Sequence, residues 1–163
     1  MNNKLEDEAQ NFVEEVGIVF EQTGLPRMAG RVLGWLLISD PPHQSTDELA
    51  TALMASKGSI STSTRHLIQF GLMERISLPG VRHDYFRIRP DAWQRMIRRG
   101  LVDEIKMMRH LAERGLELLA DKTPLTRKWL TEMLAMYTFL EREFPVLLER
   151  WEQEHKGDKI PAR

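Results

Sequence analysis

The sequence of 163 residues contains no cysteine. Disulfide bonds, thiolate zinc sites, iron-sulfur clusters and cysteine nucleophiles are therefore excluded. Long apolar runs are also lacking, because the longest, Val32 to Ile38, is far shorter than the roughly 20 residues that cross a bilayer. The first residues hold no apolar signal-peptide region. We expect a cytoplasmic protein that is neither secreted nor membrane-spanning.

Patterns typical of catalysis or metal binding are missing too. The histidines are scattered along the chain, and none has a second ligand at the spacing of a known metal site. The sequence has no glycine-rich phosphate loop and no nucleophile elbow. We therefore expect no enzymatic activity, no metal and no cofactor.

Charge is unevenly distributed, although the net charge is only −1. Residues 1–55 hold 3 basic and 9 acidic side chains, whereas residues 56–99 hold 9 basic and 3 acidic ones. The remaining residues are nearly balanced. A basic segment within an otherwise acidic chain indicates contact with a polyanion, although a basic module neutralised by its acidic neighbours would look the same.

Apolar periodicity predicts helices in the first half of the chain. Residues 3–22 form an amphipathic pattern that Gly24 ends, and Pro26 opens a second helix that ends at Asp40-Pro41-Pro42. Ser45 or Thr46 caps a short helix that reaches about Ala55.

The next segments predict a helix-turn-helix followed by a hairpin. Ser56-Lys57-Gly58 turns the chain, and a further helix runs from Ser59 to Phe70. Period-two segments, Met73–Leu78 and His83–Ile88, then flank Pro79-Gly80-Val81-Arg82.

Two long helices are expected in the second half of the chain. The first runs from Asp91 to about Leu119, and the second starts near Thr123-Pro124. In the second, apolar residues recur at heptad spacing and predict a seam that packs on another helix. Pro145 is expected to kink or split this helix.

The helix after the turn carries the candidate DNA-binding residues. Ile60, Thr64 and Leu67 share one face, which leaves the opposite face short, polar and rich in hydrogen-bonding groups. Such side chains suit base edges in the major groove, and an arginine pairs bidentately with guanine. Lys57 and the amides of Ser59 and Ile60 are expected to contact phosphate. The candidate DNA-binding residues of this helix, its turn and the hairpin are Lys57, Ser59, Ser61, Thr62, Arg65, His66, Gln69, Arg82 and His83.

Several strings of this sequence resemble one family. They are Gly24-Leu-Pro-Arg-Met-Ala-Gly-Arg31, Leu36-Leu-Ile-Ser-Asp-Pro-Pro42, Ser56-Lys-Gly-Ser-Ile-Ser61, Gly71-Leu-Met-Glu-Arg75 and Pro79-Gly-Val-Arg82. Over residues 20–90 the chain resembles the winged-helix MarR superfamily, and within it the GbsR-like branch. The resemblance implies a homodimeric DNA-binding transcription regulator, usually a repressor, with a ligand pocket between its dimer and DNA modules. The Pro-Gly wing is shorter than in better-known members and lacks their Asp-Arg-rich tip.

The predicted fold class is mainly α, a winged helix-turn-helix with one β-hairpin wing, flanked by N- and C-terminal dimerisation helices. The predicted parts are an N-terminal dimerisation helix (1–24), the DNA-binding domain (25–90), a C-terminal dimerisation region (91–155) and a tail (156–163). The candidate dimerisation residues are Phe12, Val16, Leu130, Met133, Tyr137, Leu140, Phe144, Leu147 and Trp151.

The predicted function is sequence-specific binding of double-stranded DNA to regulate transcription, as a homodimer on a pseudo-palindromic operator. The alternative is a winged-helix module that binds an acidic protein partner. A small-molecule effector is a further expectation, with Trp35, Trp93 and Trp129 as candidate pocket residues. Core packing is the competing use of these tryptophans.

Overall fold

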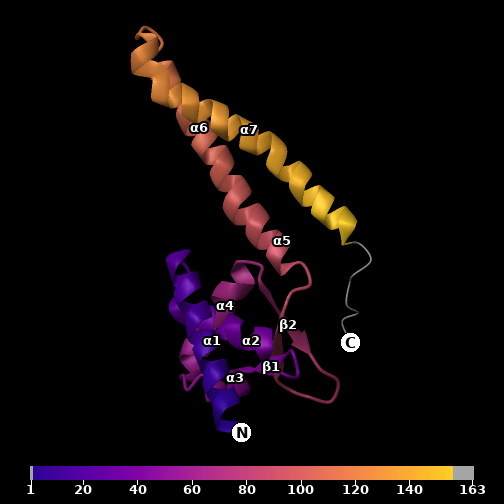
Figure 1. Ribbon diagram of the computed structural model, residues 1–163. Helices are drawn as coiled ribbons and strands as arrows, with labels where there is room; N and C mark the ends of the chain where they lie inside the picture. The colour runs from indigo at the N-terminus through magenta and orange to yellow at the C-terminus, as the bar shows by residue number, and fades with distance from the viewer. Residues whose placement is uncertain (1, 156–163) are drawn as a thin grey trace. The chain divides into compact units, whose positions relative to one another are not determined.

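The computed structural model describes the backbone of residues 2–155 and the side chains of residues 6–155. The predicted tail, residues 156–163, lies outside this range. Contacts divide the chain into two units, with the boundary between residues 95 and 96. The elements in chain order are α1 (Asn2–Gln22), α2 (Arg27–Ile38), β1 (Gln44–Ser45), α3 (Thr46–Ala52), α4 (Lys57–Gln69), β2 (Met73–Ser77), β3 (Asp84–Ile88), α5 (Ala92–Ile97), the π-helical segment η1 (Arg98–Val102), α6 (Asp103–Leu118) and α7 (Pro124–Glu154) (Figure 1).

Helix α2 is the centre of the first unit. Its buried residues, among them Val32, Leu33 and Leu36, point in several directions around the helix axis. A helix that is apolar on most sides must be enclosed, and α1, α3, α4 and β3 all pack against it. Leu49 of α3 and Leu67 of α4 are fully buried in the same core.

Helix α1 approaches α2 closely because glycines line the crossing. A Cβ atom at Gly30 would lie 2.9 Å from the Cα atom of Gly17 and 2.9 Å from the Cβ atom of Phe20. Val13 of α1 is fully buried in the first unit's core. The structure therefore groups α1 with the helix-turn-helix, whereas the predicted division separated residues 1–24 from 25–90.

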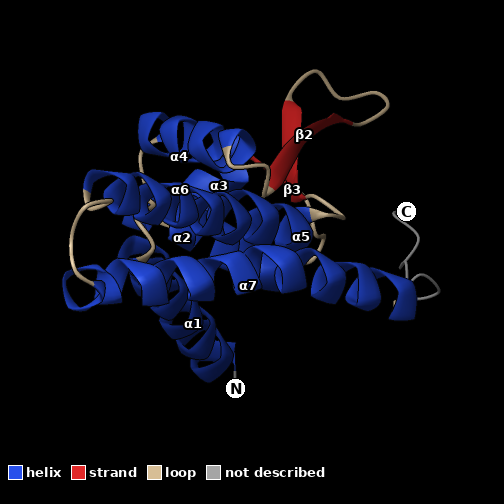
Figure 2. Ribbon diagram, turned by 90° about the horizontal axis from the view of Figure 1, so that it is seen from above, coloured by secondary structure: helices blue, strands red, loops and turns tan. Residues whose placement is uncertain are grey.

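The predicted hairpin is part of a three-stranded antiparallel sheet with the order β1-β3-β2. Met73 pairs with Ile88 at one end of β2, and Ser77 pairs with Asp84 at the other. The additional strand, β1, is only two residues long and pairs Gln44 with Phe86. It was not predicted because two polar residues give no strand pattern. Figure 2 shows the strands beside the helices of this unit.

In the second unit, α6 and α7 pack against each other. A Cβ atom at Gly115 of α6 would lie 2.7 Å from Leu130 of α7, so the two helices touch closely there. Arg109 of α6 also forms an ion pair with Glu141 of α7. Pro145 lies inside α7 and does not split it in two. Among the described residues, no helix is both long and apolar enough to span a membrane.

The α1–α2 crossing gives a stability prediction. Gly30→Ala improves helix propensity by about 1 kcal/mol, but its methyl group meets backbone atoms of α1 that cannot move aside. We expect a net destabilisation of about 1–3 kcal/mol in urea unfolding at fixed protein concentration. Gly58→Ala is the matched control, because only the Ser56 Oγ, at 3.9 Å, lies near its added Cβ. Equal stability of the two variants would contradict the tight crossing.

Candidate nucleic-acid interface

Helix α4 begins earlier than predicted. Ser56 is its N-cap, and the Ser56 Oγ accepts a hydrogen bond from the Ser59 amide at 3.2 Å. The Ile60 amide donates to the Ser56 carbonyl at 3.1 Å. The prediction that the Ser59 and Ile60 amides contact phosphate is therefore wrong, because both are engaged within the helix. The first-turn amides that helix geometry directs outward are those of Lys57 and Gly58.

The two faces of α4 lie as predicted. Ile60, Thr64 and Leu67 are buried, while the opposite face exposes Thr62, Arg65 and Gln69. Among the residues predicted at the margins, Ser61 is exposed, and Ser59 and His66 are half-buried. The helix thus presents a polar surface on a fixed apolar base.

Helix α3 is held at its start by a capping box. The Ser45 Oγ accepts from the Glu48 amide at 3.3 Å, and the Glu48 carboxylate accepts from the Ser45 amide at 2.7 Å. These hydrogen bonds to the charged form lower the pKa of Glu48 below its usual value. Glu48 therefore stays ionised to lower pH than an ordinary glutamate, and the capping box keeps this end of α3 fixed.

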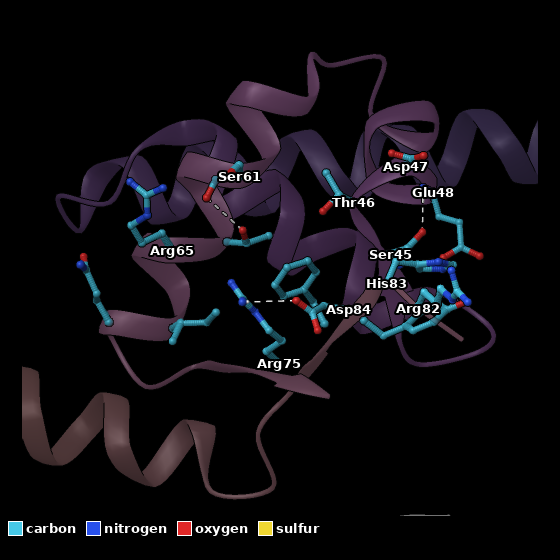
Figure 3. Close-up of a pocket in the computed structure, with 15 residues that line it drawn as sticks. Ser45, Thr46, Asp47, Glu48, Ser61, Arg65, Arg75, Arg82, His83 and Asp84 are labelled. Carbon is cyan, nitrogen blue, oxygen red and sulfur yellow. Dashed lines mark hydrogen bonds and ion pairs between the residues drawn. The ribbon is translucent and has the colours of Figure 1, made fainter. Parts of the chain in front are cut away.

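A cleft of about 760 Å³ lies between α4, the start of α3 and the hairpin. Figure 3 shows Arg65 and Ser61 on α4, Asp47 and Glu48 on α3, and Arg75 and Asp84 on the strands. The lining combines cationic and anionic groups with small polar ones. Its residues are Ser45, Thr46, Asp47, Glu48, Ser61, Thr64, Arg65, Ile68, Gln69, Arg75, Arg82, His83, Asp84, Tyr85 and Phe86.

Ion pairs engage two of the cations at this interface. The Lys57 Nζ lies 2.8 Å from the Asp47 carboxylate, and the Arg75 guanidinium lies 3.3 Å from that of Asp84. Both pairs are exposed to solvent. Among the side chains of residues 6–155 the structure records no ion pair for Arg65 or Arg82, so their guanidinium groups are available to an external anion.

Arg75 lines the cleft but was not a candidate from the sequence. Its guanidinium lies over the Phe86 ring, 5.8 Å from the ring centre, in addition to its pairing with Asp84. The hairpin pattern of the sequence could have revealed the contact between Arg75 and Phe86, because antiparallel pairing places these two residues opposite each other. The sequence contained the basic residue but did not show which face of the strand borders α4.

The wing loop is longer than predicted, spanning residues 78–83 between β2 and β3. Arg82 and His83 are both exposed, and both line the cleft. His83 belongs to the loop rather than to the strand, and its ring centre lies 4.9 Å from that of Tyr85. His43 meets the same tyrosine edge-on at 5.3 Å.

The three candidate effector residues have different surroundings. Trp35 packs against the core of the first unit, and its indole Nε1 is buried without a hydrogen-bond partner among the described residues. Trp93 and Trp129 are exposed. None of the three lines the cleft, so the effector pocket stays a prediction.

The candidate dimerisation residues differ in how far their own unit covers them. On α1, Phe12 is exposed and Val16 is half-buried, while Leu147 and Trp151 of α7 are exposed. The other seam residues of α7 share its side with buried Leu148, and we assign them to packing on α6, where Leu130 meets Gly115. These half-buried residues are Leu130, Met133, Tyr137, Leu140 and Phe144.

Comparison with known proteins agrees with this geometry. The family described as "MmpR5-like MarR family transcriptional regulator" matches residues 91–154. The HTH-type transcriptional regulator MmpR5 of Mycobacterium tuberculosis (strain ATCC 25618 / H37Rv) is 43% identical over 153 residues, which cover 94% of this chain and 92% of the relative. The chain belongs to the MarR family of winged-helix transcriptional regulators.

Other relatives of this MarR-family chain support the same assignment. A solved structure titled "Crystal Structure of a transcriptional regulator" has a TM-score of 0.70 and 43% identity, and the match covers 90% of this chain and 99% of that one. The putative HTH-type transcriptional regulator YvaV of Bacillus subtilis (strain 168) is 28% identical over 96% of this chain and 94% of its own length. The predicted fold class and the function of a DNA-binding transcriptional regulator are confirmed. The GbsR-like branch stays a prediction.

The carboxylates of the interface give a prediction for DNA affinity. Asp47→Asn frees Lys57 and removes a negative charge that repels phosphate. Exposed pairs contribute about 0–1 kcal/mol, so we expect binding to operator and random duplex to tighten up to about fivefold. Fluorescence anisotropy at a fixed salt concentration measures the affinity for operator and for random duplex. Glu132→Gln is the control, since it breaks an exposed lysine pair on α7 instead; a weaker affinity of Asp47→Asn would show that Asp47 assists binding.

Proposed function

We propose that this MarR-family regulator binds a pseudo-palindromic operator as a homodimer, with α4 in the major groove and the wing at the adjacent minor groove. The carrying observation is the polar face of α4, where Arg65 lies exposed and without an ion pair in the described chain. Beneath that face, Ile60 and Leu67 are fully buried and hold the helix rigidly. A rigid helix is what discrimination between base edges requires.

Each predicted DNA-binding residue has a proposed role that follows from its position. Arg65 pairs bidentately with guanine, and Ser61, Thr62 and Gln69 bond neighbouring base edges. Ser59 and His66 act at the margins of this contact, and Lys57 exchanges Asp47 for a phosphate. Arg82 and His83 lie on the wing loop, where an arginine suits a narrow minor groove.

We assign dimerisation mainly to an outer apolar stripe of α7, which takes in the exposed Leu147 and Trp151 of the predicted seam but none of the half-buried seam residues that pack on α6. The stripe follows helical spacing, and its residues are 44–80% exposed. Its members are Leu125, Trp129, Met136, Phe139, Val146, Leu147 and Trp151. An apolar surface of this extent is typical of a protein interface. The predicted residues Phe12 and Val16 of α1 remain candidates for a second contribution.

Repression of transcription and control by a small-molecule effector are parts of the same proposal. A relative 28% identical over 93 residues, 57% of this chain and 50% of its own length, is the transcriptional repressor OpcR of Bacillus subtilis (strain 168). Repression by occupying an operator needs no further activity of the chain. The buried Trp35 indole, which has no hydrogen-bond partner among the described residues, is the proposed donor to a small-molecule effector. The GbsR-like assignment rests on the strings in residues 20–90.

The major-groove role of α4 is tested by one pair of variants. Arg65→Ala should lower discrimination between operator and random duplex by about 1–3 kcal/mol, because a bidentate base contact is lost. Lys57→Ala should weaken binding to operator and random duplex alike, because a phosphate contact carries no sequence information. It should also reduce the slope of log affinity against log salt concentration by about one unit. Titrations at several salt concentrations separate the two effects.

The outcome that contradicts this proposal is an unchanged operator-to-random ratio for a folded, dimeric Arg65→Ala protein. The recognition surface would then lie elsewhere than on α4. Arg114→Ala on α6 is the charge-matched control, because it removes an exposed arginine of the second unit. Its operator-to-random ratio should equal that of the wild type.

The dimer is tested by sedimentation at micromolar concentration, where the wild type should have about twice its chain mass of 19.0 kDa. Phe139→Glu should shift the protein toward monomer, because it places a charge within the outer stripe. Thr131→Glu adds the same charge to another side of α7 and should leave the dimer intact. A monomeric wild type, or a dimer that tolerates Phe139→Glu, would rule out the stripe as the interface.

A further inference from the structure

The turn between α3 and α4 has an unusual helix end. Met54 adopts a left-handed backbone conformation with a φ of 50°, which costs a residue with a side chain about 1 kcal/mol relative to glycine. The Ala55 amide donates to the Ala50 carbonyl at 3.0 Å, and the Met54 amide donates to the Thr51 carbonyl at 3.3 Å. These two bonds define a Schellman motif that has methionine in the glycine position.

The Schellman motif leaves two carbonyls of the turn without a backbone partner, and side chains from two other helices supply the donors. The Gln10 Nε2 of α1 donates to the Ala52 carbonyl at 3.1 Å. The Arg31 Nη2 of α2 donates to the Leu53 carbonyl, also at 3.1 Å. Every carbonyl from Leu49 to Leu53 thus has a donor, since the Leu53 amide donates to Leu49.

Arg31 is itself fixed in place. Its Nε lies 2.6 Å from the Glu14 carboxylate of α1, and its side chain is only 16% exposed. One guanidinium therefore links α1, α2 and the turn. Arg27 pairs with the other oxygen of Glu14 at 3.0 Å but has no recorded bond to the turn.

We propose that Gln10 and Arg31 are positioning residues for DNA recognition, which set the angle of α4 by holding the carboxyl end of α3 from α1 and α2. This inference rests on the proposed reading of the operator by α4. Base readout requires accurate placement of Arg65, whereas the attraction of phosphates is long-ranged and tolerates small rotations. Neither positioning residue needs to touch DNA.

The test compares operator and random duplex, with the operator selected from genomic fragments by the wild-type protein. Arg31→Met keeps the aliphatic stem and removes the polar links to Glu14 and the turn, and it should lower the operator-to-random affinity ratio about tenfold. Gln10→Met removes one neutral hydrogen bond and should lower the ratio about threefold. For both variants the affinity for random duplex and the salt slope should stay at wild-type values, because no phosphate contact is lost.

Arg27→Met is the matched control, since it removes an arginine bonded to the same Glu14 without touching the turn, and its ratio should equal that of the wild type. In an Arg65→Ala background, Arg31→Met should cause little further loss of discrimination between operator and random duplex. The side chain of Arg65, which Arg31 is proposed to position, is already absent in that background. Circular dichroism and sedimentation establish that each variant is folded and associated as the wild type is. If Arg31→Met does not fold, Gln10→Met decides alone.

Two results overturn the inference while leaving the proposed function standing. One is that the wild type discriminates between operator and random duplex, but neither Arg31→Met nor Gln10→Met changes the affinity ratio. The other is an equal loss of affinity for operator and random duplex, which would indicate general damage rather than misplacement of α4. A wild type that selects no fragment over random DNA would instead refute the proposed function, and the inference with it.

Discussion

The enclosure of α2 is the constraint on which the first unit depends. A helix with apolar residues on most sides is stable only when neighbours cover each of them, and α1, α3, α4 and β3 do so. Gly30 and Gly34 let α1 approach so closely that side chains of α1 reach the far end of α3. The apolar core thereby fixes the polar contacts around the turn, and these contacts in turn hold α4.

Much of the fold was predictable because its signals are local. Gly24 ends α1, Pro26 precedes α2, and the apolar face of α4 is evident in the spacing of Ile60, Thr64 and Leu67. The short strand β1 was not predictable, because it exists only through its pairing with β3. The start of α4 was misplaced by two residues, since serine at 56 or at 59 can cap a helix and only the observed hydrogen bond distinguishes them.

The candidate site was predicted more completely on α4 than on the strands. Helical periodicity alone separates Arg65 from the buried face, whereas the place of Arg75 depends on how the hairpin packs beside α4. The seam of α7 shows the same limit. Heptad spacing correctly indicated a helical partner, but it did not distinguish α6 of the same chain from a second copy.

The mixture of charges at the interface has a consequence for specificity. Lys57 and Arg75 are paired with carboxylates, so a phosphate gains from them only the difference between two ion pairs. In the proposed function, these ion pairs lower the non-specific affinity that phosphate contacts supply. Arg65 has no recorded ion pair in the described chain, and in its proposed role its contribution depends on meeting the correct base edge. In the proposed function, paired cations at the interface and an unpaired base-reading Arg65 together favour the operator over random DNA.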